Sequence, residues 1–474
     1  MTLSVARCPL SAGSRRSSVE SSCLENGQRT TDNGQRIAPR VACDSLVALG
    51  AATADGAVLF AKNSDRPAGE CQPLVQIPAA RHPPGARLRC QYIEIAQVAE
   101  TARVIGSRPH WLWGFEHGLN QHGVAVGNHT VFSKDPLTGH GLIGMDLVRL
   151  ALERGRTAPQ AVEVISGLVE TYGQGGSGYA DTDWPYHNSF LIADRREAYL
   201  LETSDRRWAV RRVEEVGSAS NHLGIGADWD ALADGTIEHA IANGWWDEAS
   251  EGRFDFAAAY RDTSVAPPVI SSGRHRRTCE LLTGARGRLT PASLRAALRD
   301  HYDGPVLRPG RTPEDERYFS VCMHADPVGT TTASMIARLP ADPDDLLRYW
   351  GSLGSPCAGV FLPYYVDATL PEILARGGAL PAPDSPWWRF KTLLTRVECD
   401  WTAYAPRVRR YWDDFEQMLA GEAEEVEGNA LRLRRAGQHA DAAGVLTRFM
   451  AGNVALALER LERLIGELGE TVQR

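Results

Sequence analysis

Cys43-Asp44-Ser45-Leu46-Val47 and Ala61-Lys62-Asn63-Ser64-Asp65-Arg66 are the two stretches that decide the fold. The first begins a short apolar run, and the second ends another apolar run that starts at Val58. Asp55-Gly56 lies between the two runs, and Asp-Gly is a strong signal for a hairpin turn. The pattern therefore predicts that Cys43 begins a strand and that a hairpin returns Asn63 and Asp65 towards it.

Residues 1–42, which precede this strand, are rich in Ser, Arg, Asn, Gly and Gln. Such a segment buries too little apolar surface to offset the entropy that it loses on ordering. We expect a disordered leader or a propeptide; a dispensable extension and a mis-assigned start are alternatives. We expect the main domain to cover residues 43–385 and a helical region to cover residues 386–474, because residues 377–386 are rich in Gly and Pro.

The composition excludes several classes of protein. The chain has 474 residues, of which 43% are hydrophobic and 23% charged, and its formal net charge is -8. A nucleic-acid partner is disfavoured because the sequence has no basic stripe, and a membrane span because no apolar run approaches about 18 residues. The nine cysteines form no CxxC and the 13 histidines no HExxH. We therefore expect no metal, no cofactor and a reducing, cytoplasmic location.

The order of apolar patterns predicts an α+β fold, because strands and helices occur in separate blocks. Helices are expected at residues 144–172, with a break near Gly155, at residues 291–298, and throughout residues 386–474. The expected strands are residues 45–49, 58–62, 90–98, 102–107, 123–128, 190–193, 198–203 and 208–213.

Cys43 is the candidate nucleophile. If the chain is cut before it, one residue carries both a thiol and a free α-amine. An α-amine has an ordinary pKa of about 7.7–8.0, which suits a general base near neutral pH. Such an amine can activate the side chain of the same residue. The alternative is that Cys43 is a small buried apolar residue, as most free cysteines are.

The other candidate catalytic residues are an aspartate and an asparagine on the returning strand, two asparagines further along the chain, and one arginine. Asp65 can hold the amine, with help from Asn63. Asn128 and Asn221 follow or end strands and can stabilise an oxyanion, a contribution of roughly 2.7–4 kcal/mol for each donor. Arg274 can bind a substrate carboxylate or orient the nucleophile. Each of these residues can equally be a turn, helix-start or strand-end residue.

Two pairs of residues are candidates for binding substrate. Lys62 and Arg66 flank the returning strand end and can lower the pKa of the thiol; the alternative is a solvated strand end. Trp111 and Trp113 have period-2 spacing and can line an apolar pocket, although two core aromatics are an equal alternative.

The chain resembles the secernin family and its bacterial dipeptidase relatives, which are cysteine N-terminal nucleophile (Ntn) hydrolases. The resemblance covers roughly residues 43–460. The motifs that carry it are Cys43-Asp44-Ser45 and residues 60–66, 92–95, 107–114, 122–128, 144–155, 243–246 and 355–357.

The resemblance implies an αββα sandwich and hydrolysis of amide bonds after autocatalytic exposure of Cys43. Wider relatives, penicillin V acylase and bile salt hydrolase, have Arg where this chain has Lys62, and Lys lacks bidentate geometry. Asn221 matches the oxyanion Asn of these relatives better than Asn128 does. Arg274 matches their active-site Arg through local spacing alone, and Arg277 is a close rival.

These observations predict a dipeptidase-like peptidase that acts on a small peptide or amide. Two alternatives are open: an N-acyl amide hydrolase similar to penicillin V acylase, and a non-enzymatic, secernin-like regulatory protein. The C-terminal helices can serve oligomerisation, so a homo-oligomer is possible.

Overall fold

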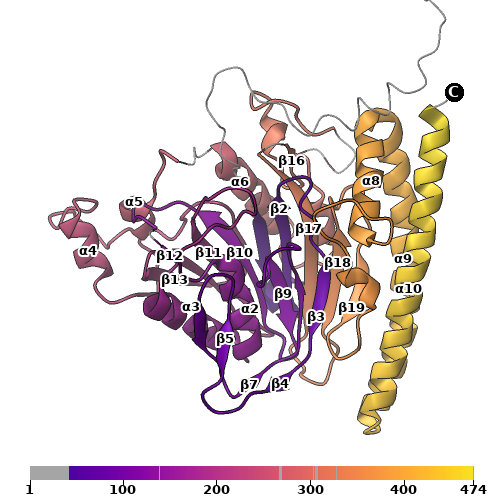
Figure 1. Cartoon of the computed structure of the whole chain (residues 1–474), viewed down its shortest axis with the longest axis horizontal. Helices are drawn as coiled ribbons and strands as arrows, with labels where there is room; N and C mark the ends of the chain where they lie inside the picture. Colours follow the sequence, from indigo (N-terminus) through magenta and orange to yellow (C-terminus); the bar gives the residue numbers. More distant parts are fainter. Residues whose placement is uncertain are drawn as a thin grey trace, which may run out of the picture. The chain divides into compact units, whose positions relative to one another are not determined.

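The fold is known from a computed structural model, which describes residues 42–137, 139–265, 269–302, 304, 308–326 and 328–472. These residues lie in one compact unit, Pro39–Arg474. Two antiparallel sheets face each other, and helices cover the outer face of each (Figure 1). The chain therefore has the α+β class and the four αββα layers that the sequence predicts.

The first sheet joins the beginning of the described chain to its later part. Within the described residues it has seven strands: β14 (Val216–Ala219), β1 (Asp44–Ala48), β2 (Val58–Arg66), β17 (Gly329–Leu339), β18 (Arg348–Leu353) and β19 (Leu362–Tyr365) in this order, with β16 (His324–Ala325) paired to β17. In Figure 1, indigo β2 lies beside orange β17. The predicted hairpin is present, because Asp44 pairs with Asn63 across β1 and β2.

The second sheet is built from the middle of the chain. Eight described strands form it, in the order β15 (Ala231–Leu232), β13 (Arg207–Val213), β12 (Ala198–Ser204), β11 (His187–Ala193), β10 (Ala125–Val131), β9 (His117–Asn120), β8 (Val104–Ser107) and β3 (Leu74–Ile77). Two short ribbons stand apart from it, β4 (Ala80–Arg81) with β7 (Glu100–Thr101) and β5 (Arg87–Arg89) with β6 (Glu94–Ala96).

Different helices cover each sheet. α2 (Gly144–Arg154) and α3 (Ala158–Tyr172) pack on the second sheet, whereas α6 (Val269–Gly284) and α7 (Pro291–Leu298) pack on the first. The starts of α3 and α7 are marked by Thr157 and Thr290, whose side chains accept a hydrogen bond from the first turn. Shorter segments complete this part of the chain: α4 (Thr236–Ala242), α5 (Phe256–Tyr260), η1 (Gly50–Ala52), η2 (Glu316–Phe319) and η3 (Glu372–Ala375).

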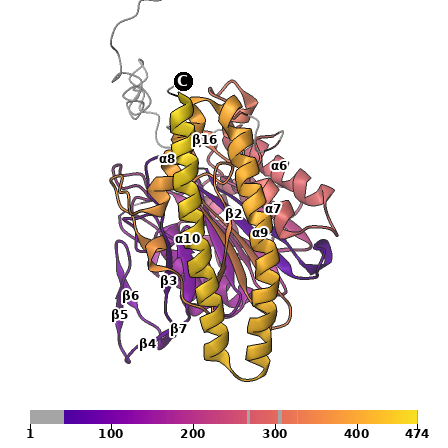
Figure 2. The same ribbon diagram turned by 90° about the vertical axis from the view of Figure 1, so that its right-hand side faces the viewer.

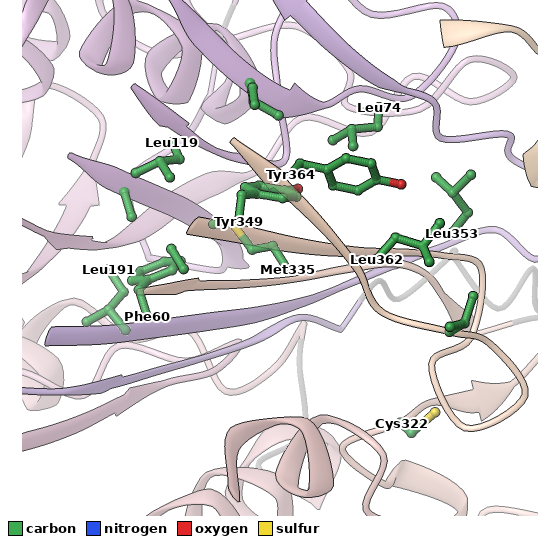
Figure 3. Close-up of a cluster of buried hydrophobic side chains, with 14 of the residues drawn as sticks. Phe60, Leu74, Leu119, Leu191, Cys322, Met335, Tyr349, Leu353, Leu362 and Tyr364 are labelled. Carbon is green, nitrogen blue, oxygen red and sulfur yellow. The ribbon is translucent and has the colours of Figure 1, made fainter. Parts of the chain in front are cut away.

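The C-terminal helices are α8 (Pro386–Cys399), α9 (Trp401–Arg435) and α10 (His439–Val472). α9 and α10 run side by side (Figure 2). They share one hydrophobic cluster with the first sheet and with the core between the sheets. Figure 3 shows this core, where Met335 and Tyr349 of the first sheet lie near Leu119 and Leu191 of the second. None of the helices in the described ranges is both long enough and apolar enough to cross a membrane.

Several predicted elements are confirmed, including the break between α2 and α3 at Gly155 and the bounds of α7. The continuous strand expected at residues 90–98 is wrong, because only Glu94–Ala96 is extended there. The long central strand β17 was not predicted. Of the predicted leader, only Ala42 lies within the described residues, and the domain boundary near residue 385 stays a prediction.

Candidate active site

Cys43 lies directly before β1 and is 2% exposed. Its backbone nitrogen donates a hydrogen bond to Asn221 Oδ1 at 2.6 Å. Its Sγ accepts one from the backbone nitrogen of Asp65 at 3.4 Å. The backbone nitrogen of Cys43, which would become the α-amine, thus has a defined partner, and so has the thiol.

Asn221 is fixed by three hydrogen bonds. Besides Cys43, its Oδ1 accepts from Arg274 Nη2 at 2.9 Å, and its Nδ2 donates to the carbonyl of Thr130 at 2.9 Å. Arg274, from α6, is fully buried and forms an ion pair with Asp44. Arg277 instead pairs with Asp300. Of the two candidate arginines, Arg274 is therefore the one that reaches the surroundings of Cys43.

The alternation of side chains along β1 and β2 divides the site into two sides. Ser45 and Lys62 point between the sheets, where Ser45 Oγ lies 2.7 Å from His129 Nε2. Asp44 and Asn63 point to the helices α6 and α7. Cys43 packs with residues of the inter-sheet side, since it shares a cluster with aromatic side chains of the segment that connects β10 and β11 of the second sheet.

Asp65 is fully buried, and its Oδ1 accepts a hydrogen bond from Thr331 Oγ1 at 2.6 Å. Its Oδ2 has no hydrogen-bond partner among the described residues. Burial raises the pKa of this carboxyl group to about 8, although Arg274 lowers it in part. Asp65 is therefore held mostly protonated at neutral pH while residue 43 bears no charged amine.

A buried charged cluster lies beside the thiol on the inter-sheet side. Lys62 Nζ is 3.4 Å from Glu116 Oε2, and Arg66 Nη1 is 3.3 Å from Glu116 Oε1. Arg66 also pairs with Glu70 at 2.7 Å. Gly127 makes room for Lys62, because a Cβ there would lie 2.4 Å from Lys62 Cδ. Substrate binding by Lys62 and Arg66 stays a prediction.

The thiol of Cys43 is protonated in this setting. Burial raises its pKa to about 12, and the lowering by Lys62 is smaller than this effect. Lys62 thus acts in the predicted direction, but the net shift is upward. A thiolate forms here only if a nearby base accepts the proton.

A small cavity of about 70 Å³ opens next to Asn221. It is lined by Phe132, Asn221, His222, Arg261, Asp262, Ser271 and Ser272. Phe132 also packs in the cluster around Cys43, with Tyr179, Tyr186 and Trp184. The sequence analysis did not identify these aromatics, although three of them lie within eight residues of one loop.

Two predicted amides are engaged away from the thiol. Asn63 Nδ2 donates to the carbonyls of Leu298 and Val321, each at 2.8 Å, and its Oδ1 accepts from Ser334. Asn128 lies in β10. With its side-chain amide oriented so that the nitrogen faces acceptors, this nitrogen donates to Glu116 Oε2 at 3.1 Å. Direct roles for Asn63 and Asn128 in catalysis stay predictions.

The predicted tryptophans lie in the layer of α2. The guanidinium of Arg149 stacks 3.9 Å from the Trp113 ring, and Trp111 packs on a cluster formed by Leu112, Ile143 and Met145. This cluster is separate from the one that contains Cys43. A role for Trp111 and Trp113 in substrate binding stays a prediction.

Asp44, Glu116 and Thr331 also escaped the sequence analysis. Asp44 was visible as a charge in an apolar strand beside Cys43. Glu116 was visible as a carboxylate directly before β9. No pattern in the sequence indicates Thr331, because its place in the site depends on the pairing of β17 with β2, which sets Thr331 opposite Asp65.

Comparisons with known proteins agree with this geometry. Peptidase family C69 matches residues 42–414. A probable dipeptidase A from Streptococcus pyogenes is 21% identical over 446 residues, which cover 82% of this chain and 92% of that protein. A probable dipeptidase from Salmonella dublin is 24% identical over 377 residues, which cover 69% of this chain and 81% of that protein.

Among solved structures, penicillin V acylase from Agrobacterium tumefaciens aligns with a TM-score of 0.39 at 13% identity, covering 68% of this chain and 86% of that one. A conjugated bile acid hydrolase from Clostridium perfringens aligns with a TM-score of 0.37 at 14% identity, covering 64% of this chain and 88% of that one. The family match spans most of the described residues and includes every site residue named above. The chain belongs to peptidase family C69 and is a hydrolase of peptide bonds.

Proposed function

We propose that this protein is a cysteine peptidase of the Ntn type that hydrolyses dipeptides once Cys43 is the first residue. One observation carries the proposal: the backbone nitrogen and the thiol of Cys43 both face fixed partners inside one buried site. The family match also begins at residue 42, directly before this cysteine.

The α-amine of Cys43 supplies the missing base. The thiol has a pKa near 12, so it needs a group that accepts its proton as the sulfur attacks. A free α-amine titrates at about 7.7–8.0 and belongs to the same residue. Sγ bonds to the scissile carbonyl carbon, the proton passes to the amine and then to the leaving nitrogen, and the C–N bond breaks. Water then hydrolyses the thioester and restores the thiol.

Asn221 and Asp65 position these atoms. Asn221 Oδ1 accepts a hydrogen bond from the nitrogen of Cys43, and Arg274 holds that oxygen in place. We assign stabilisation of the oxyanion to the backbone nitrogen of Asp65, which donates to Cys43 Sγ, and to Nδ2 of Asn221, which would exchange its bond to the Thr130 carbonyl. The carboxylate of Asp65 stabilises the α-amine of Cys43 once the amine has taken up a proton. Asn63 anchors the strand that carries Asp65.

The small size and the charges of the cavity support a small, charged substrate. At about 70 Å³ it is far smaller than the roughly 300–1,000 Å³ of pockets for drug-sized ligands. Its lining includes the adjacent Arg261 and Asp262. A dipeptide at neutral pH carries one carboxylate and one ammonium group, which these two side chains match in charge. The two probable dipeptidases that the chain resembles support the same class of substrate.

Activation requires cleavage of the bond between Ala42 and Cys43. While Ala42 is attached, the nitrogen of Cys43 is an amide and cannot accept a proton. Ala42 is fully buried and packs with Ile270, Phe319 and Met323, so the scissile bond lies inside the site. We propose that Cys43 itself cleaves this bond. We also propose that the enzyme acts in the cytoplasm, because among the described residues Cys43, Cys71, Cys90, Cys279, Cys322 and Cys357 form no disulfide.

The test is to express the full chain, measure its intact mass, and assay a dipeptide panel with penicillin V as the contrasting amide. We expect loss of residues 1–42 and turnover of dipeptides. The Cys43→Ala variant should retain the leader and be inactive. A chain that keeps residues 1–42 and still hydrolyses dipeptides would refute the mechanism, and turnover of penicillin V alone would assign a different substrate.

A further inference from the structure

A second buried group of reactive side chains lies outside the proposed catalytic residues. His301, Cys322, His324 and Cys357 each offer one metal-ligand atom, and these atoms all lie within 4.8 Å of one another. His301 and Cys322 are fully buried, Cys357 is 4% exposed, and the side chain of His324 is 5% exposed. Figure 3 shows the sulfur of Cys322.

Three separate segments supply the four residues. His301 follows α7, His324 begins β16 with Cys322 two residues before it, and Cys357 lies in the turn after β18. His324 Nε2 is 3.3 Å from Cys357 Sγ and 3.5 Å from Cys322 Sγ. In a tetrahedral zinc site with bonds of about 2.0–2.1 Å to nitrogen and 2.3 Å to sulfur, neighbouring N and S ligands are about 3.6 Å apart. The spacing of His324 from both sulfurs therefore fits a shared metal ion.

The surroundings also have the features of a metal site. The other ring nitrogen of His324, Nδ1, lies 3.4 Å from Glu398 Oε1, and a carboxylate on the far side of a ligating His commonly fixes its ring and tautomer. The Trp401 ring packs against both imidazoles, with centroid distances of 5.5 Å to His301 and 5.4 Å to His324. A cavity of about 230 Å³ borders His324 and Glu398.

We propose that His301, Cys322, His324 and Cys357 bind one zinc ion in a closed, structural site. Two thiolates and two imidazoles are a donor set that selects zinc among the common divalent ions. This proposal departs from the expectation of no metal that was drawn from the sequence. That expectation rested on spacing, and the spacing is uninformative here because the ligands come from positions 301, 322, 324 and 357.

The proposed ion would join the segments around Cys322 and Cys357, and both segments form hydrogen bonds to Thr331 in β17. The backbone nitrogen of Met323, next to Cys322, donates to Thr331 Oγ1 at 2.8 Å. Ser355, two residues before Cys357, donates to the carbonyl of Thr331 at 2.9 Å. Thr331 in turn donates to Asp65. Zinc would thus fix Asp65 indirectly, as a positioning element that never touches the substrate.

Metal content is the direct test, and it does not depend on the proposed catalytic mechanism. The full chain is expressed with zinc in the medium, purified without chelator, and measured by inductively coupled plasma mass spectrometry. We expect about one zinc ion per chain from one four-ligand site. Cys357→Ser and His301→Ala should lower this value to near zero. Cys279→Ser is the matched control, because Cys279 Sγ also lies 3.7 Å from a His nitrogen but belongs to no such group.

A second measurement covers variants that fail to fold. Wild-type protein is stripped of metal with a chelator and titrated with Co²⁺, which should give thiolate charge-transfer and tetrahedral d–d absorption at one equivalent. Its melting temperature should fall on stripping and recover with Zn²⁺. A wild-type chain that binds neither ion overturns the proposal, as does a disulfide between Cys322 and Cys357 in protein isolated under reducing conditions. Retention of full metal by both ligand variants overturns it equally.

Discussion

Cys43 and Cys357 are both buried thiols, yet their surroundings shift the pKa values of the two thiols in opposite directions. Burial raises the pKa of Cys43 to about 12, and the carboxylate of Glu116 adds to this. Burial acts in the same sense on Cys357, but a hydrogen bond from Cys322 and the charge of His324 lower the pKa of its thiol well below the usual value. Burial therefore does not decide the chemistry of a thiol in this fold; the neighbouring groups do.

The difference assigns different roles to the two cysteines. Cys43 needs a base at the moment of attack, and cleavage of its own peptide bond would provide one. Cys357 already has cationic and hydrogen-bonding partners, which suit a permanent thiolate such as a metal ligand. The same chain thus keeps one thiol neutral until processing and another in a setting for an anion.

Exchange of each thiol in turn should separate the two roles most clearly. Cys43→Ala should reduce dipeptide hydrolysis by roughly 10³-fold or more, as loss of a nucleophile does in other hydrolases, and should leave zinc bound. Cys357→Ser should lose zinc and retain processing at Cys43. Turnover assays, intact mass and metal analysis on the same samples check this. Equal loss of activity in both variants would contradict the distinction.

Asn221 should matter next most. Asn221→Ala removes the acceptor for the nitrogen of Cys43 and a donor for the oxyanion, so kcat should fall by about 10²–10³. Asn221→Asp keeps the acceptor oxygen but loses the donor, so it should process its leader more fully than Asn221→Ala while turning over dipeptides slowly. Steady-state kinetics and the processed fraction by mass give the two readouts. Wild-type kcat in Asn221→Ala would remove this residue from the mechanism.

The ion pair between Arg274 and Asp44 should contribute to stability. Both side chains are fully buried, so Arg274→Met leaves the carboxylate of Asp44 unpaired, which costs about 3–5 kcal/mol. Urea unfolding in the Cys43→Ala background, where no processing occurs, measures the loss. Asp44→Asn added to Arg274→Met should restore part of it, and Arg81→Met, in an exposed pair with Glu100, should change little. Equal unfolding of the Arg274 and Arg81 variants would show that the buried pair is not needed.

The pH dependence should show a smaller, graded effect from Asp65. Its folded pKa of about 8 lies above the ordinary value of 3.8, so the folded chain holds this proton more tightly than the unfolded chain does. The resulting stability is complete below about pH 4 and is lost as the pH rises through 8. In the Cys43→Ala background, Asp65→Asn should flatten the fall in unfolding free energy between pH 5 and pH 8. An unchanged slope would mean that Asp65 is ionised in the folded chain.

Local signals in the sequence were enough for the first hairpin and several helices. The Asp55-Gly56 turn and the apolar runs beside it predicted a hairpin that returns Asn63 and Asp65 towards Cys43, and in the structure Asp44 pairs with Asn63. Gly155 ended α2, and the Thr290 cap with Pro291 began α7. These features depend on residues close in the chain, so a single sequence contains them.

The sequence by itself therefore determined that Cys43 opens a strand, that Asp65 returns near it, and that helices and strands occur in separate blocks. Only the tertiary structure decided that Arg274 rather than Arg277 reaches Asn221, and that Asn63 turns to the helices. It alone placed β17 beside β2 and gathered His301, Cys322, His324 and Cys357. The reason is physical: these contacts join residues that are distant in the chain, and their partners are chosen by the packing of sheets and helices rather than by local backbone preference.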